Sequence, residues 1–353
     1  MRTGDFKISY RSDRAIFQTG VVKFWVLLLT VGLCVMPFFL GRYSIFLVNL
    51  SGIAIIGAIG INMLTGYCGQ LSLGHAAFIA IGAYTTAILP NLLPLSNFPL
   101  SLPLRLFLSG TVSAGVGVLI GLPALRLKGL YLALSTMSVY FITVLVLLKG
   151  GAITGGAIGI NVAPAKLFGY SFSTDTHYFF LIFTIVFIGV AFSRNIVRTK
   201  IGRSWMAIRD RDIAAEGIGI SLVRYKLIAF FISSFYAGVA GSLFALYLGY
   251  ISPGNFDFML SVKYVAMIIM GGMGSILGSI YGAVFITMFP EVIRIFVSVL
   301  VDHPSREIST AIALIQEGTF GALIILFLIF EPRGLYGIWR SIKLYIRMWP
   351  FSH

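Results

Sequence analysis

The sequence predicts an all-α, polytopic integral membrane protein with about ten transmembrane helices in two inverted halves. Three observations lead to this fold class. Hydrophobic residues make up 58% of the 353 residues and charged residues only 11%, far from the balance of a soluble domain. Ten apolar stretches are long enough to cross a bilayer, which takes about 20 residues as a helix. Two glycine-rich segments interrupt these apolar runs, one in each half of the chain.

The expected spans are separated by short polar or glycine-rich connections. They cover residues 24–41, 45–64, 75–93, 104–125, 130–148, 178–192, 227–250, 262–275, 280–301 and 308–330. The first span follows a basic segment, as the core of a signal peptide does. It is long for such a core and no small-x-small cleavage site follows it, so we expect a retained helix. The last span is needed to return the C-terminus to the side of the N-terminus, and four glycines between 271 and 278 supply the break this requires.

Positive charge is concentrated in four segments of the chain. Of the 26 Lys and Arg residues, 19 lie in residues 1–23, 126–128, 194–226 and 331–353. Cytoplasmic segments of membrane proteins carry such an excess of Lys and Arg. We therefore expect a multi-pass protein of the bacterial cytoplasmic (inner) membrane with both termini in the cytoplasm.

With this orientation, we expect residues 1–353 to form a single transmembrane domain. It would have a cytoplasmic N-terminus (1–23), a cytoplasmic loop (194–226) and a cytoplasmic tail (331–353). The connections at 149–177 and 252–261 are sparse in positive charge and are expected on the outer face.

Composition excludes several other classes of protein. The net charge of +14 does not indicate nucleic acid as a partner, because the basic residues flank apolar spans that face a lipid bilayer. Cys34 and Cys68 lack metal-ligand spacing and the four histidines are scattered, so we expect no metal, cofactor or structural disulfide. There is no Walker A phosphate loop, so the chain should not hydrolyse ATP by itself. Neither paired acids nor a Ser–His arrangement occurs among the spans, which argues against an enzyme.

The two glycine-rich breaks, at 66–84 and 271–282, are the first candidates for function. Glycine permits unwound backbone at membrane depth where it lines a cavity. The spans around 45–148 and 227–330 would enter the membrane in opposite directions, which is the pattern of an inverted repeat with a substrate path at its interface. A structural turn, with His75 capping the following helix, is the alternative for the first break.

Ionisable and polar groups within the spans are few. The substrate-path candidates are Asn62, Gly69, Gln70, Ser72, His75 and Glu317. Arg105, Glu291 and Arg294 also lie in spans, and the last two are three residues apart, so that they can pair on one helix face. Glu317 is a lone acid, and such residues are functional candidates by default. A proton- or sodium-coupled carrier would need more acids, so their scarcity favours a translocator whose energy comes from another subunit.

The basic connection 194–226 contains a second candidate site. Its residues 204–217 suit one short amphipathic helix. The apolar face would hold Trp205, Ile208 and Ala215, and the charged face Arg209, Asp212 and Glu216. A charged cytoplasmic helix joined to spans on both sides suits docking in a groove of a partner protein. The alternative is a helix lying on anionic headgroups, which the acidic residues in this window disfavour.

Four motifs, taken in order, resemble the permease subunits of branched-chain amino-acid ABC importers. They are Leu64-Thr-Gly-Tyr-Cys-Gly-Gln-Leu-Ser-Leu-Gly-His-Ala-Ala-Phe78, Leu122-Pro-Ala-Leu-Arg-Leu-Lys-Gly-Leu-Tyr131, Arg209-Asp-Arg-Asp-Ile-Ala-Ala-Glu-Gly-Ile-Gly-Ile-Ser221 and Gly271-Gly-Met-Gly-Ser-Ile-Leu-Gly278. The resemblance covers roughly residues 45–337, nearly the whole membrane part.

This resemblance implies an importer of two similar permeases, two cytosolic ATPases and an external binding protein that delivers a branched-chain or related neutral amino acid. It also implies that residues 210–219 are the coupling loop that docks on the ATPase. The commonest such loop begins Glu-Ala-Ala, whereas here the order is Ala-Ala-Glu, so the side chain that meets the ATPase stays open. The implied coupling residues are Arg209, Asp210, Asp212, Ala214, Ala215, Glu216 and Gly219. Permeases for urea or short amides, and a stand-alone secondary transporter, are the alternatives.

Overall fold

Helices dominate the protein, as its composition predicts. In this computed structural model the described residues form thirteen α-helices, one π-helical and one 3₁₀ segment, and two ribbons of two short strands each. The structure describes residues 20–92, 101–124, 127, 129–164, 166–167, 170–172, 174–300, 318–319, 321–327, 329–331 and 334–348. The predicted tenth span falls partly outside these residues, and Glu317 lies outside them.

The chain divides into a short unit, residues 1–46, and a large unit, residues 47–353. The short unit holds α2 (Gly20–Phe39) and the first residues of α3 (Arg42–Ile61). Helix α2 corresponds to the first predicted span, and large apolar side chains near its end are exposed, Phe38 at 74% and Phe39 at 85%. Such exposure suits a helix that contacts lipid instead of water.

The long helices of the large unit follow the predicted spans. They are α3 with its π-helical extension η1 (Asn62–Tyr67), α4 (His75–Leu92), α5 (Ser101–Ala124), α6 (Leu130–Lys149), α8 (Asp175–Arg198), α11 (Leu222–Leu248), α12 (Phe258–Gly271) and α13 (Ile276–Leu300). Within the described ranges, six helices are long and apolar enough to cross a membrane, starting at residues 42, 101, 130, 175, 222 and 276. Helix α12 has 14 residues, fewer than the roughly 20 that a crossing takes.

Helices α3 and α11 form the interior of the large unit. In the most apolar 18-residue stretch of each of these two helices, 72% and 67% of the residues are buried, against 28% in α6 and 22% in α8. A buried hydroxyl cluster also ties three helices together: Oγ1 of Thr86 on α4 lies 2.5 Å from Oγ of Ser109 on α5 and 2.6 Å from Oγ of Ser242 on α11. The peripheral helices thus keep apolar surface for lipid, and the central helix α3 leads directly into the first break.

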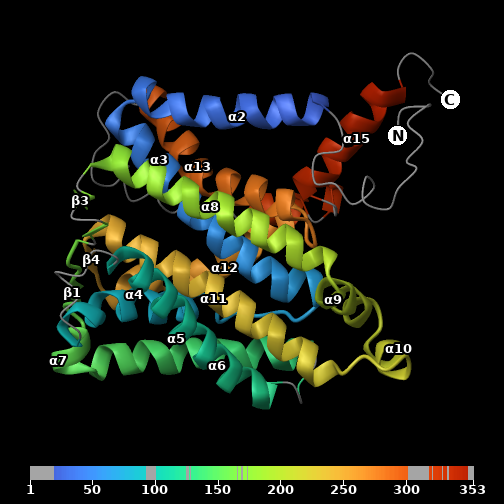
Figure 1. Cartoon of the computed structure of the whole chain (residues 1–353), viewed down its shortest axis with the longest axis horizontal. Helices are drawn as coiled ribbons and strands as arrows, with labels where there is room; N and C mark the ends of the chain where they lie inside the picture. The colour runs from blue at the N-terminus through green and yellow to red at the C-terminus, as the bar shows by residue number, and fades with distance from the viewer. Residues whose placement is uncertain are drawn as a thin grey trace. The chain divides into compact units, whose positions relative to one another are not determined.

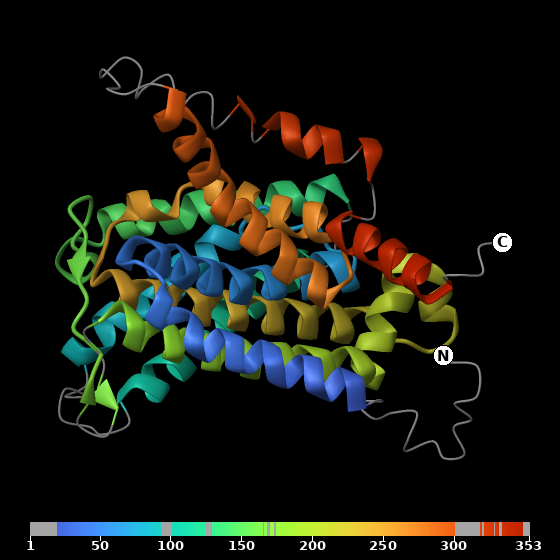
Figure 2. The same ribbon diagram turned by 90° about the horizontal axis from the view of Figure 1, so that it is seen from above.

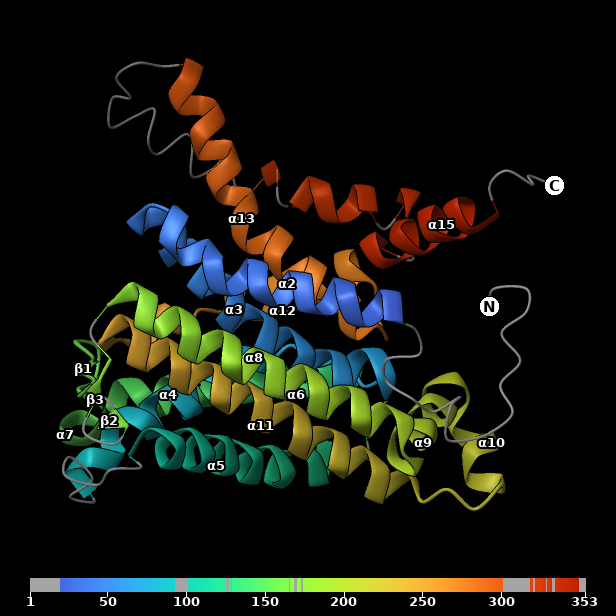
Figure 3. The same ribbon diagram turned by 45° about the horizontal axis from the view of Figure 1, so that its top comes forward.

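The connections of the large unit gather at two opposite ends. At one end lie α7 (Gly151–Thr154) and the two ribbons, as all three views show (Figures 1, 2 and 3). Strand β1 (Ile160–Asn161) pairs antiparallel with β4 (Tyr250–Ile251), and β2 (Lys166–Leu167) with β3 (Tyr170–Ser171). At the other end lie α9 (Lys200–Asp210), α10 (Asp212–Gly217) and the end of the C-terminal helix α15 (Gly334–Met348). The connections expected outside are thus at the end opposite the basic connection.

Candidate functional site

The two glycine-rich breaks meet inside the large unit and share one asparagine. Asn62, the first residue of η1, is 1% exposed. Its Nδ2 donates to the backbone oxygen of Ser275 at 2.9 Å, and its Oδ1 accepts from the backbone nitrogen of Gly274, also at 2.9 Å. The Asn62 amide therefore bonds to two consecutive backbone groups of the second break, the nitrogen of Gly274 and the oxygen of Ser275. This substrate-path candidate holds the two breaks together.

At this junction the two backbones approach so closely that side chains are excluded. A Cβ atom on Gly66 would lie 2.6 Å from the backbone nitrogen of Gly274. Gly274 itself has a φ of +76°, in the left-handed region that costs other residues about 1–2 kcal/mol. The glycines of both breaks are therefore required by contact and conformation at this point.

Helix α9 reaches the same junction through Arg209. Nη1 of Arg209 donates to the backbone oxygen of Gly66 at 2.9 Å, and its Nε lies 3.3 Å from Oδ1 of Asp210 in an ion pair. A cavity of about 590 Å³ lies beside these contacts, lined by both breaks, Arg209, and Tyr336 and Arg340 of α15. The last turn of α9 is thus in direct contact with the first break.

The basic connection contains two helices, so the prediction of one helix over 204–217 is wrong. Helix α9 ends at Asp210 and α10 begins at Asp212. Arg211 between them has a φ of −158° and a ψ of 108°, an extended conformation that a continuous helix does not contain. The chain changes direction at Arg211, which the apolar periodicity does not reveal.

The three residues expected on the apolar face are all buried, although they lie on two helices, Trp205 and Ile208 on α9 and Ala215 on α10. Trp205 is fully buried, and its Nε1 donates to the backbone oxygen of Tyr225 on α11 at 2.8 Å. Ile208 and Ala215 are buried as well. Helix α9 is therefore fixed to α11 by Trp205 and to the first break by Arg209.

The implied coupling residues divide between surface and interior. Those exposed are Arg209, Asp210, Ala214, Glu216 and Gly219, whereas Asp212 is half-buried and Ala215 is buried. Two isoleucines that the sequence analysis did not single out, Ile213 and Ile218, are 78% and 77% exposed beside them. Residues 209–219 form an exposed tip of the α9–α10 connection. Its combination of large apolar and charged side chains is the composition of a protein contact surface. Isoleucines between charged residues in the window 204–217 and just after it are the signal that could have found them.

His75 is held by the protein itself and does not cap α4. Its Nε2 lies 3.0 Å from the backbone oxygen of Gly57 on α3, and its ring meets that of Tyr264 edge-on with the centroids 5.1 Å apart. The nitrogen of Ala76, in the first turn of α4, donates instead to Oγ of Ser261 on α12 at 2.9 Å. His75 therefore ties the first break to α3, and Ala76 ties it to α12.

The other path candidates differ in their surroundings. The backbone nitrogen of Gln70 donates a hydrogen bond to the backbone oxygen of Leu64, and its backbone oxygen accepts one from Oγ1 of Thr65. Its side chain is half-buried. Gly69 is exposed, with a φ of +74°. Ser72 is buried, and among the described residues its Oγ has no hydrogen-bond partner.

The ionisable residues expected in the spans, where the structure describes them, bond to other parts of the chain. Nη2 of Arg294 lies 2.7 Å from Oε1 of Glu291, which confirms the predicted pair. Arg105 is buried, and its Nη1 donates to the backbone oxygen of Ala163 at 2.7 Å. Within the described ranges no group of three or more His, Cys, Asp or Glu residues could hold a metal ion, and Cys34 and Cys68 are free thiols.

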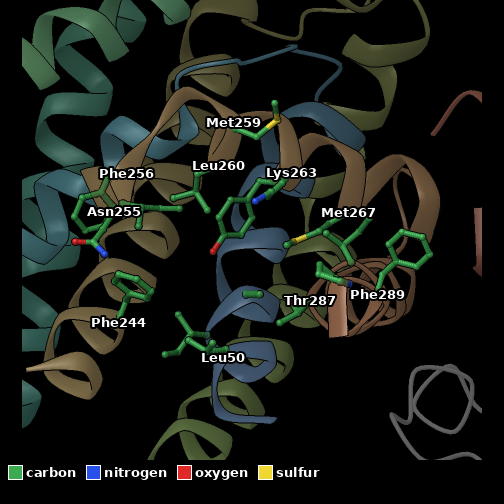
Figure 4. A pocket seen from close by; sticks show the side chains of 16 residues that line it. Leu50, Phe244, Asn255, Phe256, Met259, Leu260, Lys263, Met267, Thr287 and Phe289 are labelled. Atoms are coloured by element: carbon green, nitrogen blue, oxygen red, sulfur yellow. The ribbon is translucent and has the colours of Figure 1, made fainter. Parts of the chain in front are cut away.

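A second cavity, of about 430 Å³, lies among α3, α4, α11, α12 and α13 (Figure 4). Its walls are largely apolar, and the one basic side chain among them is Lys263 of α12. Lys263 falls in the predicted span 262–275 but was not among the ionisable residues expected in the spans. A lone lysine inside an apolar run is the signal that could have found it.

Six apolar helices of spanning length, packed around a junction of broken helices, define a multi-pass membrane protein. Residues 43–328 match the family model of the branched-chain amino acid transport system / permease component. The chain belongs to this family of transport permeases, which confirms the family that the four motifs predicted.

Curated relatives agree with this family. The chain is 34% identical over 342 residues to the high-affinity branched-chain amino acid transport system permease protein LivM of Salmonella typhimurium, covering 90% of this chain and 76% of that protein. The values are the same for LivM of Escherichia coli strain K12. A probable LivM of Methanocaldococcus jannaschii is 23% identical over 320 residues, covering 80% of this chain and 90% of that protein. No solved structure matches the chain significantly.

Proposed function

We propose that the chain is a transmembrane permease subunit of an ATP-driven importer for branched-chain or related neutral amino acids. Its partners are two cytosolic ATPases, a second homologous permease and an external binding protein. Membership of the permease family and the names of the relatives at 34% identity support the transport role and the substrate class. The partners follow from that role, because a permease without a nucleotide site needs a source of energy and a donor of substrate.

The observation that carries this proposal is the pair of contacts that α9 makes. The exposed tip of the α9–α10 connection is continuous with Trp205, bonded to α11, and with Arg209, bonded to Gly66 of the first break. In this proposal the ATPases bind the tip, and their closure on ATP displaces α9. The Arg209–Gly66 contact then moves the junction of the breaks and opens the path inward.

Positive-inside bias supports placing the α9–α10 end in the cytoplasm together with both termini. The short helices α4 and α12 each adjoin one glycine-rich break, and corresponding interrupted segments in two halves favour an inverted repeat. Ten crossings in two inverted halves remain part of the proposal. Labelling of a single cysteine at position 213 by a membrane-impermeant maleimide tests the orientation. Labelling in intact cells would contradict it.

The coupling role is tested in proteoliposomes that contain the complete importer. Replacing Asp210 and Glu216 together by alanine should uncouple ATP hydrolysis from leucine uptake and leave membrane insertion intact. Wild-type uptake by this variant would contradict the assignment. Uptake by the chain alone, driven by an ion gradient, would point to a secondary transporter. Uptake of urea or amides but not leucine would assign the other substrate class of this family.

A further inference from the structure

The cavity around Lys263 combines one cation with apolar walls at membrane depth. We infer that it binds the translocated amino acid, with the Lys263 ammonium facing the substrate carboxylate and the apolar walls facing its branched side chain. This inference takes the substrate class from the proposed function and adds the site in this chain that holds it.

The depth of the cavity follows from contacts between α3 and α12. Tyr264, next to Lys263, packs edge-on against His75, whose Nε2 is bonded to the backbone oxygen of Gly57. A Cβ atom on Gly57 would lie 2.8 Å from a carbon of the Tyr264 ring, so the two residues are at the same level. Gly57 lies near the middle of the 26-residue apolar segment 42–67. Lys263 is therefore near mid-membrane, where transporters place their substrate sites.

Lys263 lies on the face of α12 that lines the cavity. Met259, Lys263 and Met267 are spaced four residues apart and all three contribute to the wall. No carboxylate pairs with Lys263 within the part of the chain that the structure describes. Ionisable side chains at this depth are costly and mark substrate paths. A zwitterionic substrate supplies the missing carboxylate.

The rest of the cavity suits the other parts of such a substrate. Leu50 of α3 and Phe244 of α11 lie across the cavity from Lys263 and provide apolar surface (Figure 4). Tyr264 is 4% exposed, and its hydroxyl makes no hydrogen bond to any described residue, so it can accept one from the substrate ammonium. Thr287 of α13 adds a second hydroxyl. The volume of about 430 Å³ falls within the range of about 300–1000 Å³ for small-molecule sites.

The test measures direct binding of radiolabelled leucine to the complete importer in nanodiscs, without binding protein or nucleotide. Lys263→Met should weaken binding about tenfold or more, because the substrate carboxylate loses its charged partner. Lys263→Arg should restore most of the affinity. Lys149→Met, which removes an exposed lysine from the end of α6, is the matched control and should bind as the wild type does. Isoamylamine, which is leucine without its carboxylate, should compete poorly with leucine in the wild type.

A second variant tests the apolar wall independently of Lys263. Leu50→Phe narrows the cavity and should weaken leucine binding more than valine binding. Wild-type affinity in Lys263→Met, equal competition by isoamylamine, or the absence of saturable leucine binding to the wild-type importer would each overturn the site. Those results leave the proposed function standing if ATP-driven leucine uptake persists in proteoliposomes. Loss of wild-type uptake itself would instead count against the proposed function.

Discussion

Oδ1 of Asn62 accepts a hydrogen bond of 2.9 Å from the backbone nitrogen of Gly274, although 212 residues separate the two in the chain. The same side chain donates to the backbone oxygen of Ser275. A single amide thus links the π-helical end of α3 to the turn between α12 and α13.

Asn62→Ala should lower the free energy of unfolding by about 1–3 kcal/mol, because the nitrogen of Gly274 loses its hydrogen-bond partner and a buried group left unpaired costs about that much. The change appears as a lower melting temperature of the purified protein in detergent. Asn161→Ala, which removes an exposed amide in β1, is the control and should leave the melting temperature unchanged. Equal melting temperatures for the two variants would show that the Asn62 bonds contribute nothing.

Gly66→Ala should destabilise the junction, since its Cβ atom would lie 2.6 Å from the nitrogen of Gly274. The backbones must separate, so we expect both a lower melting temperature and slower uptake. Gly115→Ala in α5 is the matched control, because nothing lies within 4 Å of the added atom. Alanine is favoured over glycine within a helix by up to about 1 kcal/mol, so this control should be neutral or stabilising. The reverse order of stabilities would refute the close contact.

Trp205→Ala should loosen α9 from α11 at a cost of about 3–5 kcal/mol, the usual range for deleting a buried aromatic side chain. Limited proteolysis should then cut the connection between 200 and 217 faster than in the wild type. Trp205→Phe keeps most of the packing and loses mainly the hydrogen bond to Tyr225. Its cleavage rate should therefore lie between those of the wild type and Trp205→Ala. Trp339→Ala, at a half-exposed tryptophan of α15, should leave the cleavage rate unaltered.

Ile213→Asp together with Ile218→Asp should abolish co-purification of the ATPases without altering the melting temperature of the permease. Both side chains are more than three-quarters exposed, so the permease itself loses little packing. Ile158→Asp is the control, since this isoleucine is 81% exposed at the opposite end of the large unit. Retention of the ATPases by the double variant would place their contact elsewhere.

Apolar length predicted most of the helices because burial in lipid leaves the backbone few alternatives. Helix α12 shows where this reasoning falls short: it begins at Phe258, four residues before the predicted start at 262. Asp257 supplies the cap, its side chain accepting from the nitrogen of Leu260 at 2.8 Å. Local hydrogen bonding, and not hydropathy, sets that boundary.

The site was predictable only where its geometry is local. Glu291 and Arg294 pair because helical spacing alone brings them together. The predicted breaks exist, but their mutual contact through Asn62 depends on how distant helices pack, which one sequence does not specify. Arg211 interrupts the amphipathic pattern without changing its composition, so the bend between α9 and α10 was missed.

The contact between Gly66 and Gly274 restricts both positions to glycine. Every other amino acid adds atoms where two main chains already touch, so neither natural drift nor laboratory selection can readily diversify them. The walls around Lys263 have no such restriction, since they are built from side chains of several helices. New substrate preferences in this architecture should arise there, and a small library at those wall positions is enough to search for them.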